Sequence, residues 1–87
     1  MQTTTTLSGG IVCRERSASG REYYLICSRV PWGQGCRVCY SVFCYSPEGA
    51  AFYFDLTQDA QRARGLVAML GRGDVAPEYL EEVLEEL

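Results

Sequence analysis

Cys36 and Cys39 are the two residues whose type and spacing come nearest to a reactive site. In a zinc knuckle or a redox loop, a C-x-x-C spacing holds two thiolates on one metal ion or in one disulfide. Here both cysteines fall inside a stretch that predicts a β-strand, in which residues three apart point to opposite faces. Because the chain also has no histidine and no second C-x-x-C, we expect neither a metal site nor a bound cofactor.

The cysteines are five in all, an odd number, and most fall inside predicted strands. A secreted chain with a disulfide framework usually carries an even number of them behind a signal peptide. The sequence shows no basic start followed by an apolar stretch, and no apolar run of membrane-spanning length. We therefore expect a cytoplasmic protein with no membrane partner, whose cysteines are buried reduced thiols. These are Cys13, Cys27, Cys36, Cys39 and Cys44.

The residue types that most enzymes use for acid–base and nucleophilic chemistry are scarce. The chain has no histidine and no lysine, so the usual general base and Schiff-base nucleophile are missing. No glycine-rich phosphate loop leads into a lysine, and no serine lies in a nucleophile-elbow sequence. Only a cysteine, a tyrosine or a pair of carboxylates could act, and nothing in the sequence pairs them. We predict that the protein is not an enzyme, and we expect no catalytic residues.

Charge divides the chain into a basic part and a short acidic end. Residues 1–73 hold all eight arginines against five acids, whereas residues 74–87 hold six acids and no base, giving a net charge of −3. Such a balance makes nucleic acid an unlikely partner by default. A solvated helix face explains the acidic end, and a docking surface for a basic partner is the alternative. Its glutamates are Glu78, Glu81, Glu82, Glu85 and Glu86.

Residues 50–70 are the stretch around which the predicted elements are arranged. An apolar strand, residues 51–54, leads through Asp-Leu-Thr into a helix, for which Thr57 has the chemistry of an N-cap. Apolar residues follow at spacings of three and four, which is the pattern of a helix that lies on a sheet. Gly71 is expected to end this helix in the left-handed conformation.

Three further strands are predicted before this stretch. They are joined by a loop at residues 17–20, a loop at residues 30–35 containing Pro31, and a turn at residues 46–49. The longest of them alternates strictly, and we expect the face that begins with Cys36 and Val38 to belong to the core. The predicted strands are residues 11–16, 22–29 and 36–45.

The last residues predict a second helix that begins at Pro77, with apolar positions at Leu80, Val83, Leu84 and Leu87. We therefore predict a single α+β domain over residues 1–87. Its fold is a four-stranded antiparallel β-meander followed by two C-terminal α-helices, in the order ββββαα. Residues 1–10 are expected to form a frayed N-terminal tail.

The C-terminal part of the chain has a recognisable pattern from Phe52 to Leu87. An aromatic strand is followed by Asp-Leu-Thr opening a helix, and then by Val-x-Pro-x-x-Leu before an acidic Val-Leu-Glu-Glu-Leu. This pattern resembles a family of short bacterial proteins known as a domain of unknown function. Members often carry serine before the proline, where this chain has Ala76. The resemblance implies four strands followed by two helices, and it implies no activity.

Helices on one side of a four-stranded sheet leave the other side open. Exposed aromatic residues there would favour association, so we predict a noncatalytic protein-interaction or regulatory module that self-associates or binds a protein partner. Residues expected to fall partly on the open side are Arg14, Arg16, Tyr24, Arg37, Phe43, Tyr45 and Tyr53. The candidate interaction surface consists of Trp32, Arg37, Tyr45, Tyr53, Glu81 and Glu85.

The alternative function is the binding of single-stranded nucleic acid on the same open side. Arginines would contact phosphates there, and tyrosine or phenylalanine rings would stack on bases, each stacked base contributing about 1 to 3 kcal/mol. The acidic last helix opposes this interpretation, because it would repel the same ligand unless it projects away from the sheet.

Overall fold

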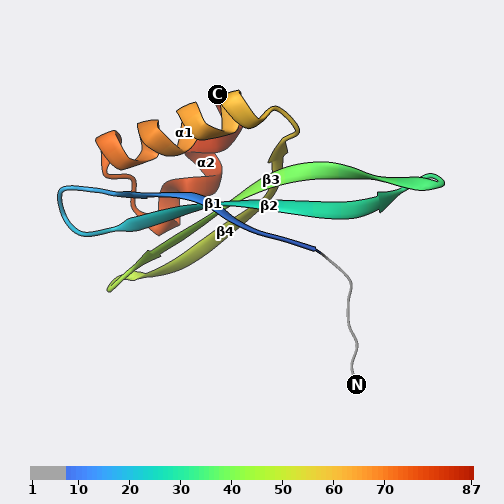
Figure 1. The fold of residues 1–87 in the computed structure, drawn as a ribbon. Coiled ribbons are helices and arrows are strands. Elements are labelled where there is room, and N and C mark those ends of the chain that lie inside the picture. The colour runs from blue at the N-terminus through green and yellow to red at the C-terminus, as the bar shows by residue number, and fades with distance from the viewer. Residues whose placement is uncertain (1–7) are drawn as a thin grey trace, which may run out of the picture.

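The protein folds into one antiparallel sheet with all its helices on one side, as a computed structural model of the chain shows (Figure 1). The structure describes residues 8–87. The spatial order of the strands is β1-β2-β3-β4, each pairing with the next along the chain, so the predicted meander is confirmed. The strands are β1 (Ser8–Arg16), β2 (Glu22–Trp32), β3 (Gly35–Ser46) and β4 (Gly49–Thr57).

The helices follow the last strand, as predicted. α1 (Ala60–Gly73) is an α-helix, and the 3₁₀-helix η1 (Pro77–Tyr79) leads directly into the short α-helix α2 (Leu80–Glu85). The prediction of one helix from Pro77 onward was therefore too simple. Ala76 precedes η1 and offers no side-chain cap, in agreement with the sequence. An α+β fold of four strands and two helices is the outcome.

α1 begins and ends at aspartates that the sequence analysis did not select. Asp59 is the N-cap, because its Oδ1 accepts the backbone N–H groups of Gln61 and Arg62 at 3.0 and 3.2 Å. Thr57, the predicted cap, instead accepts the N–H of Asp59. At the other end, Asp74 takes the left-handed conformation that we had expected of Gly71.

The hairpin between β2 and β3 is longer than predicted. Residues 30–35 were expected to form a loop because Pro31 cannot donate to a sheet, yet β2 continues through Trp32 and turns at Gly33 and Gln34. The exception has a simple cause. Within residues 8–87, the pairing of β1 with β2 starts at Ser8 and Arg29, so in this part of the chain no strand faces that edge of β2 at Pro31 and its missing N–H costs no hydrogen bond there.

The core lies between the helices and the face of the sheet that carries Tyr23. This tyrosine is fully buried, and its hydroxyl donates to the carbonyl oxygen of Val75 at 2.6 Å. The polar end of the ring is thereby satisfied inside the core. Buried residues of the core cluster are Tyr23, Leu25, Val42 and Cys44 from the sheet, and Ala63, Val67, Leu70, Leu80 and Leu84 from the helices.

Only part of the predicted core face of β3 is buried. Val42 and Cys44 are buried, but Cys36 and Val38 are exposed because the β2–β3 hairpin extends beyond the helices (Figure 1). Conversely, Cys39 on the opposite face is fully buried. Strict alternation assigns faces correctly, but it does not say how far along the strand a helix reaches.

The predicted tail at residues 1–10 overlaps the first strand. Residues 1–7 lie outside the described residues, while Ser8 to Gly10 belong to β1 and pair with β2. Gly9 runs so close to β2 that a Cβ atom there would stand 1.8 Å from the carbonyl oxygen of Cys27. Only glycine fits this position without a shift of the backbone.

Replacing Leu70 with alanine tests the core. Leu70 is fully buried in α1, and we expect Leu70→Ala to lower the free energy of unfolding by about 2 to 5 kcal/mol, because its methyl groups leave a cavity. The half-exposed Leu87 is the matched control, and Leu87→Ala should change that free energy by about 0.5 kcal/mol or less. Urea unfolding followed by far-UV circular dichroism measures both. Equal losses in the two variants would contradict this location of the core.

Candidate interaction surface

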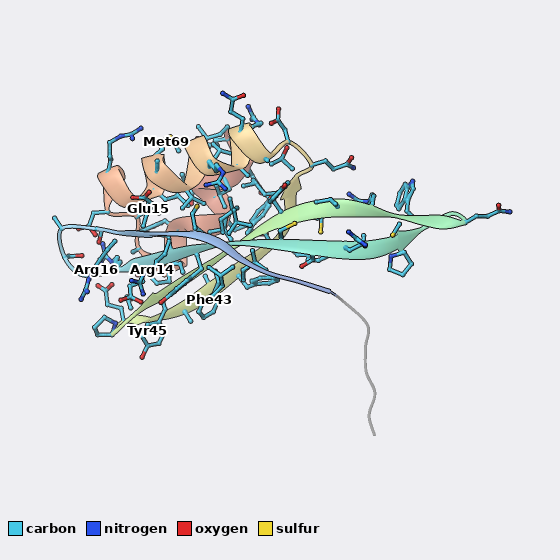
Figure 2. All side chains as sticks on the ribbon, in the orientation of Figure 1. Arg14, Glu15, Arg16, Phe43, Tyr45 and Met69 are labelled. Atoms are coloured by element: carbon cyan, nitrogen blue, oxygen red, sulfur yellow. The ribbon has the colours of Figure 1, made fainter. Side chains whose placement is uncertain are left out.

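The open side of the sheet carries a cluster of apolar side chains, which we call the open-face cluster. It consists of Ile11, Tyr24, Ile26, Phe43 and Tyr45, which together line a shallow hollow of about 310 Å³. Ile11 stands opposite Ile26, and Tyr24 stands opposite Phe43 with 6.2 Å between ring centroids. Figure 2 shows Phe43 and Tyr45 on the side of the sheet away from α1.

Two arginines of β1 accompany the open-face cluster. Arg14 stands opposite Tyr24 and Arg16 opposite Glu22, and both arginines are exposed on the same side as Phe43 and Tyr45 (Figure 2). Arg16 makes a long ion pair with Glu22, at 3.9 Å between Nη1 and Oε2. The hydroxyl of Tyr24 donates to Glu22, and this hydrogen bond raises the pKa of the tyrosine. A basic border therefore lies beside the apolar hollow.

Arg37 is held by a carboxylate instead of facing solvent freely. Its guanidinium makes a two-pronged hydrogen bond and ion pair with Asp55, and it lies 4.7 Å from the ring centroid of Trp32. Such a forked pair fixes the plane of the guanidinium. The hydrogen bond from Arg37 lowers the pKa of Asp55 below its ordinary value. Two residues predicted to bind a partner, Arg37 and Trp32, are thus engaged with each other.

Asp55 occupies a left-handed backbone conformation, with φ of 59°, at an irregularity in the pairing of β3 with β4. Its backbone N–H donates to the hydroxyl of the buried Ser41 at 2.9 Å, outside the regular ladder. Aspartate tolerates this conformation better than most residues. The ion pair of Asp55 with Arg37 therefore joins this irregular part of β4 to β3.

A second depression, which we call the edge groove, runs between β4 and the last helices. Its floor and walls include residues 51–54 of β4, together with Pro77 and Leu80, and its volume is about 390 Å³. Three carboxylates border it: Glu78 of η1 and Glu81 and Glu85 of α2. The edge groove is therefore part aromatic and part acidic.

Four of the six predicted interaction residues divide between these two surfaces, and Trp32 and Arg37 line neither of them. Tyr45 belongs to the open-face cluster, whereas Glu81 and Glu85 border the edge groove. Tyr53 also lines the groove, and its expected place on the open side was wrong. Its partner across the sheet is Val42, a core residue, so the tyrosine lies on the helix side.

Several exposed apolar residues were missed by the sequence analysis. Ile11 and Phe52 are 66% and 55% exposed, and Phe54 is exposed to a similar degree. Alternation along β4 could have separated Phe52 and Phe54 from Tyr53, since neighbours in a strand point to opposite faces. Alternation could not have predicted the face on which Ile11 lies, because the pairing of β1 with β2 is irregular between Ile11 and Cys13.

The cysteines do not form a common site. Cys36 stands opposite Pro31 and Cys39 opposite Ser28, so the two thiols of the C-x-x-C lie on opposite faces, and only Cys36 is exposed. Burial raises the pKa of the Cys39 and Cys44 thiols, which keeps both protonated near neutral pH. These two thiols serve as small apolar side chains.

No family model, curated protein or solved structure matches the chain. The resemblance of residues 52–87 to a bacterial family therefore stays a prediction. Within residues 8–87, no helix has both the length and the apolar character that crossing a membrane requires.

The Arg37–Asp55 pair predicts a specific acid sensitivity. Because the pKa of Asp55 is lower in the folded state than in the unfolded chain, the pair stabilises the fold above about pH 4 and stops doing so as the pH falls through the folded-state pKa. Asp55→Asn keeps a residue suited to the left-handed backbone but removes the charge. We expect this variant to be less stable at pH 7 and to lose less stability on acidification.

Urea unfolding at a series of pH values measures this effect. Arg37→Gln should reproduce the weaker acid dependence, and the double variant should add little to either single change, since all three remove the same pair. The prediction would be contradicted if Asp55→Asn lost as much unfolding free energy between neutral and acid pH as the wild-type protein does.

Proposed function

We propose that this protein is a noncatalytic interaction module that associates with a second copy of itself through the open-face cluster. The observation that carries the proposal is the gathering of Ile11, Tyr24, Ile26, Phe43 and Tyr45 on the side of the sheet that the helices leave uncovered. A small protein gains by burying such a surface against another molecule.

The arginines of β1 favour a particular arrangement of the two copies. Arg14 and Arg16 are exposed on the open side near one edge of the sheet, whereas Glu81 and Glu85 belong to α2 on the helix side. Two sheets can stack face to face about 10 Å apart. A twofold axis parallel to the strands would set the β1 edge of each copy over the β4 edge of the other. The arginines of the two copies then lie at opposite borders of a shared apolar centre, where they do not repel each other.

We further propose that the module works in the cytoplasm and belongs to the bacterial family that residues 52–87 resemble. The buried, protonated thiols of Cys39 and Cys44 support a reducing compartment. The ββββαα order of elements supports the family resemblance.

A charge placed in the cluster tests self-association. We expect Tyr45→Arg to weaken dimer formation about tenfold or more, because an arginine in the centre of an apolar interface must be desolvated without a partner. Tyr79→Arg is the matched control, since Tyr79 is 53% exposed against 56% for Tyr45 but lies in η1 on the helix side. Sedimentation across a dilution series measures the dimer constant. A wild-type protein that stays monomeric at all concentrations overturns the proposal.

Single-stranded nucleic acid is the second candidate ligand of the same surface. The observation in its favour is that Arg14 and Arg16 border the rings of Tyr24, Phe43 and Tyr45, which combines phosphate-binding and base-stacking groups. The engagement of Arg37 with Asp55 weighs against it.

Titration of a labelled single-stranded oligonucleotide at low and moderate salt tests this candidate. Binding should weaken with salt and be reduced in Arg14→Ala and Tyr45→Ala, whereas Arg37→Ala should have less effect because this side chain is already paired. Absence of binding at low salt removes nucleic acid from consideration and leaves the self-association proposal intact.

A further inference from the structure

The edge groove follows the free edge of a β-strand. Ala51, Phe52, Tyr53 and Phe54 are consecutive in β4, and all four line the groove. Successive side chains of a strand point to opposite faces of the sheet. A single hollow can therefore contact these four consecutive residues only if it runs along the edge of the strand. The groove therefore borders the backbone of β4 as well as its side chains.

Within residues 8–87, β4 pairs with β3 alone, and its other edge faces no strand. The backbone N–H and C=O groups that point outward along such an edge can form a ladder with an added extended segment. Residues 51–54 offer about 13 Å of strand for this purpose.

The wall of the groove selects the charge of such a segment. Glu78, Glu81 and Glu85 border it, no basic residue lines it, and in the described part of the chain none of these three carboxylates forms an ion pair. Glu81 and Glu85 are one helical turn apart and so project from the same side of α2. A cationic side chain entering from the strand edge would find two carboxylates within reach.

We propose that the edge groove binds an extended, basic segment of another protein, which adds to β4 as a fifth strand. Alternate residues of the added strand face the two sides of the sheet. Arginine or lysine at the positions facing the helices would pair with Glu81 and Glu85. Apolar residues at the intervening positions would cover Phe52 and Phe54, both of which are about half exposed. This site adjoins the open-face cluster, because Phe52 stands opposite Phe43, but the edge of β4 and the three carboxylates lie outside that cluster.

A second copy of the chain fits this groove less well. Pairing of β4 with β4 of another copy would bring the glutamates of both α2 helices to one border, where like charges repel. Pairing of β1 with β4 of another copy joins two different edges and would continue into open-ended chains. A basic segment from a different protein meets neither difficulty.

A short labelled peptide of alternating valine and arginine is the probe. We expect it to bind the full-length protein, as measured by fluorescence anisotropy, and the affinity to fall with salt. A peptide with glutamate in place of arginine should not bind. The double variant Glu81→Gln/Glu85→Gln should weaken binding about three- to tenfold.

Glu82→Gln/Glu86→Gln is the matched control. It removes the same charge at the same spacing from the same end of the chain, but neither residue lines the groove. This variant should bind the peptide as the wild type does. Equal weakening in both double variants would show general attraction to an acidic protein, and it would overturn the proposal. The Tyr45→Arg variant should also bind the peptide normally, which separates this site from the open-face cluster.

Methylated peptides test whether the segment adds as a strand. In an extended peptide the amides of alternate residues point to the same edge, so N-methylation of every second amide removes the donors of one edge only. One methylated peptide should lose binding and the other should keep it. If both bind as well as the unmethylated peptide, strand addition is wrong. Growth of large oligomers that the peptide does not reverse would instead identify β1 of another copy as the occupant, which also overturns the proposal.

Discussion

The packing of α1 on Tyr23, Leu25 and Val42 is the contact on which the rest of the structure depends. The sheet has two faces, and the chain supplies helices for one of them. Burying that face provides hydrophobic free energy that a chain of 87 residues needs in order to fold. Within residues 8–87, nothing packs over the second face, so Ile11 and Tyr45 there are exposed. An open surface is thus a consequence of how this small domain obtains its core.

Polar side chains maintain the geometry around that contact, and this use restricts what they can bind. Arg37 holds the irregular segment of β4 through Asp55. Arg21 connects two other parts of the structure. It pairs with Glu48 of the β3–β4 turn and with Asp74 at the end of α1. Other charged residues lie at the borders of the two surfaces. They are Arg14 and Arg16 beside the open-face cluster, where Arg16 forms a long ion pair with Glu22, and Glu78, Glu81 and Glu85 beside the edge groove.

The two proposed surfaces place different demands on a partner. The open-face cluster is broad and apolar, so it suits a flat surface of matching shape, such as a second sheet. The edge groove borders the edge of β4, which has no partner strand within residues 8–87, and it is lined by carboxylates, so it suits an extended cationic segment. Phe52 and Phe54 contribute to the groove while remaining exposed. Both surfaces can be occupied at once only if a dimer formed through the open face leaves the rings of Phe52 and Phe54 uncovered. The edge of β4 in each copy would then stay available to an added strand.

The sequence alone determined the order of the four strands and the helices after them, because alternation in β3, helical spacing after Thr57 and turn residues such as Pro47 act over a few neighbours. It also indicated which residue types could form an interface. Only the tertiary structure decided where each of them lies. Tyr53 faces the helices because of its register with Val42, Arg37 is occupied because an irregular turn of β4 brings Asp55 to it, and Cys36 is exposed because the helices end before the hairpin does. Register, bulges and the reach of a helix depend on contacts between distant parts of the chain, which local patterns do not contain.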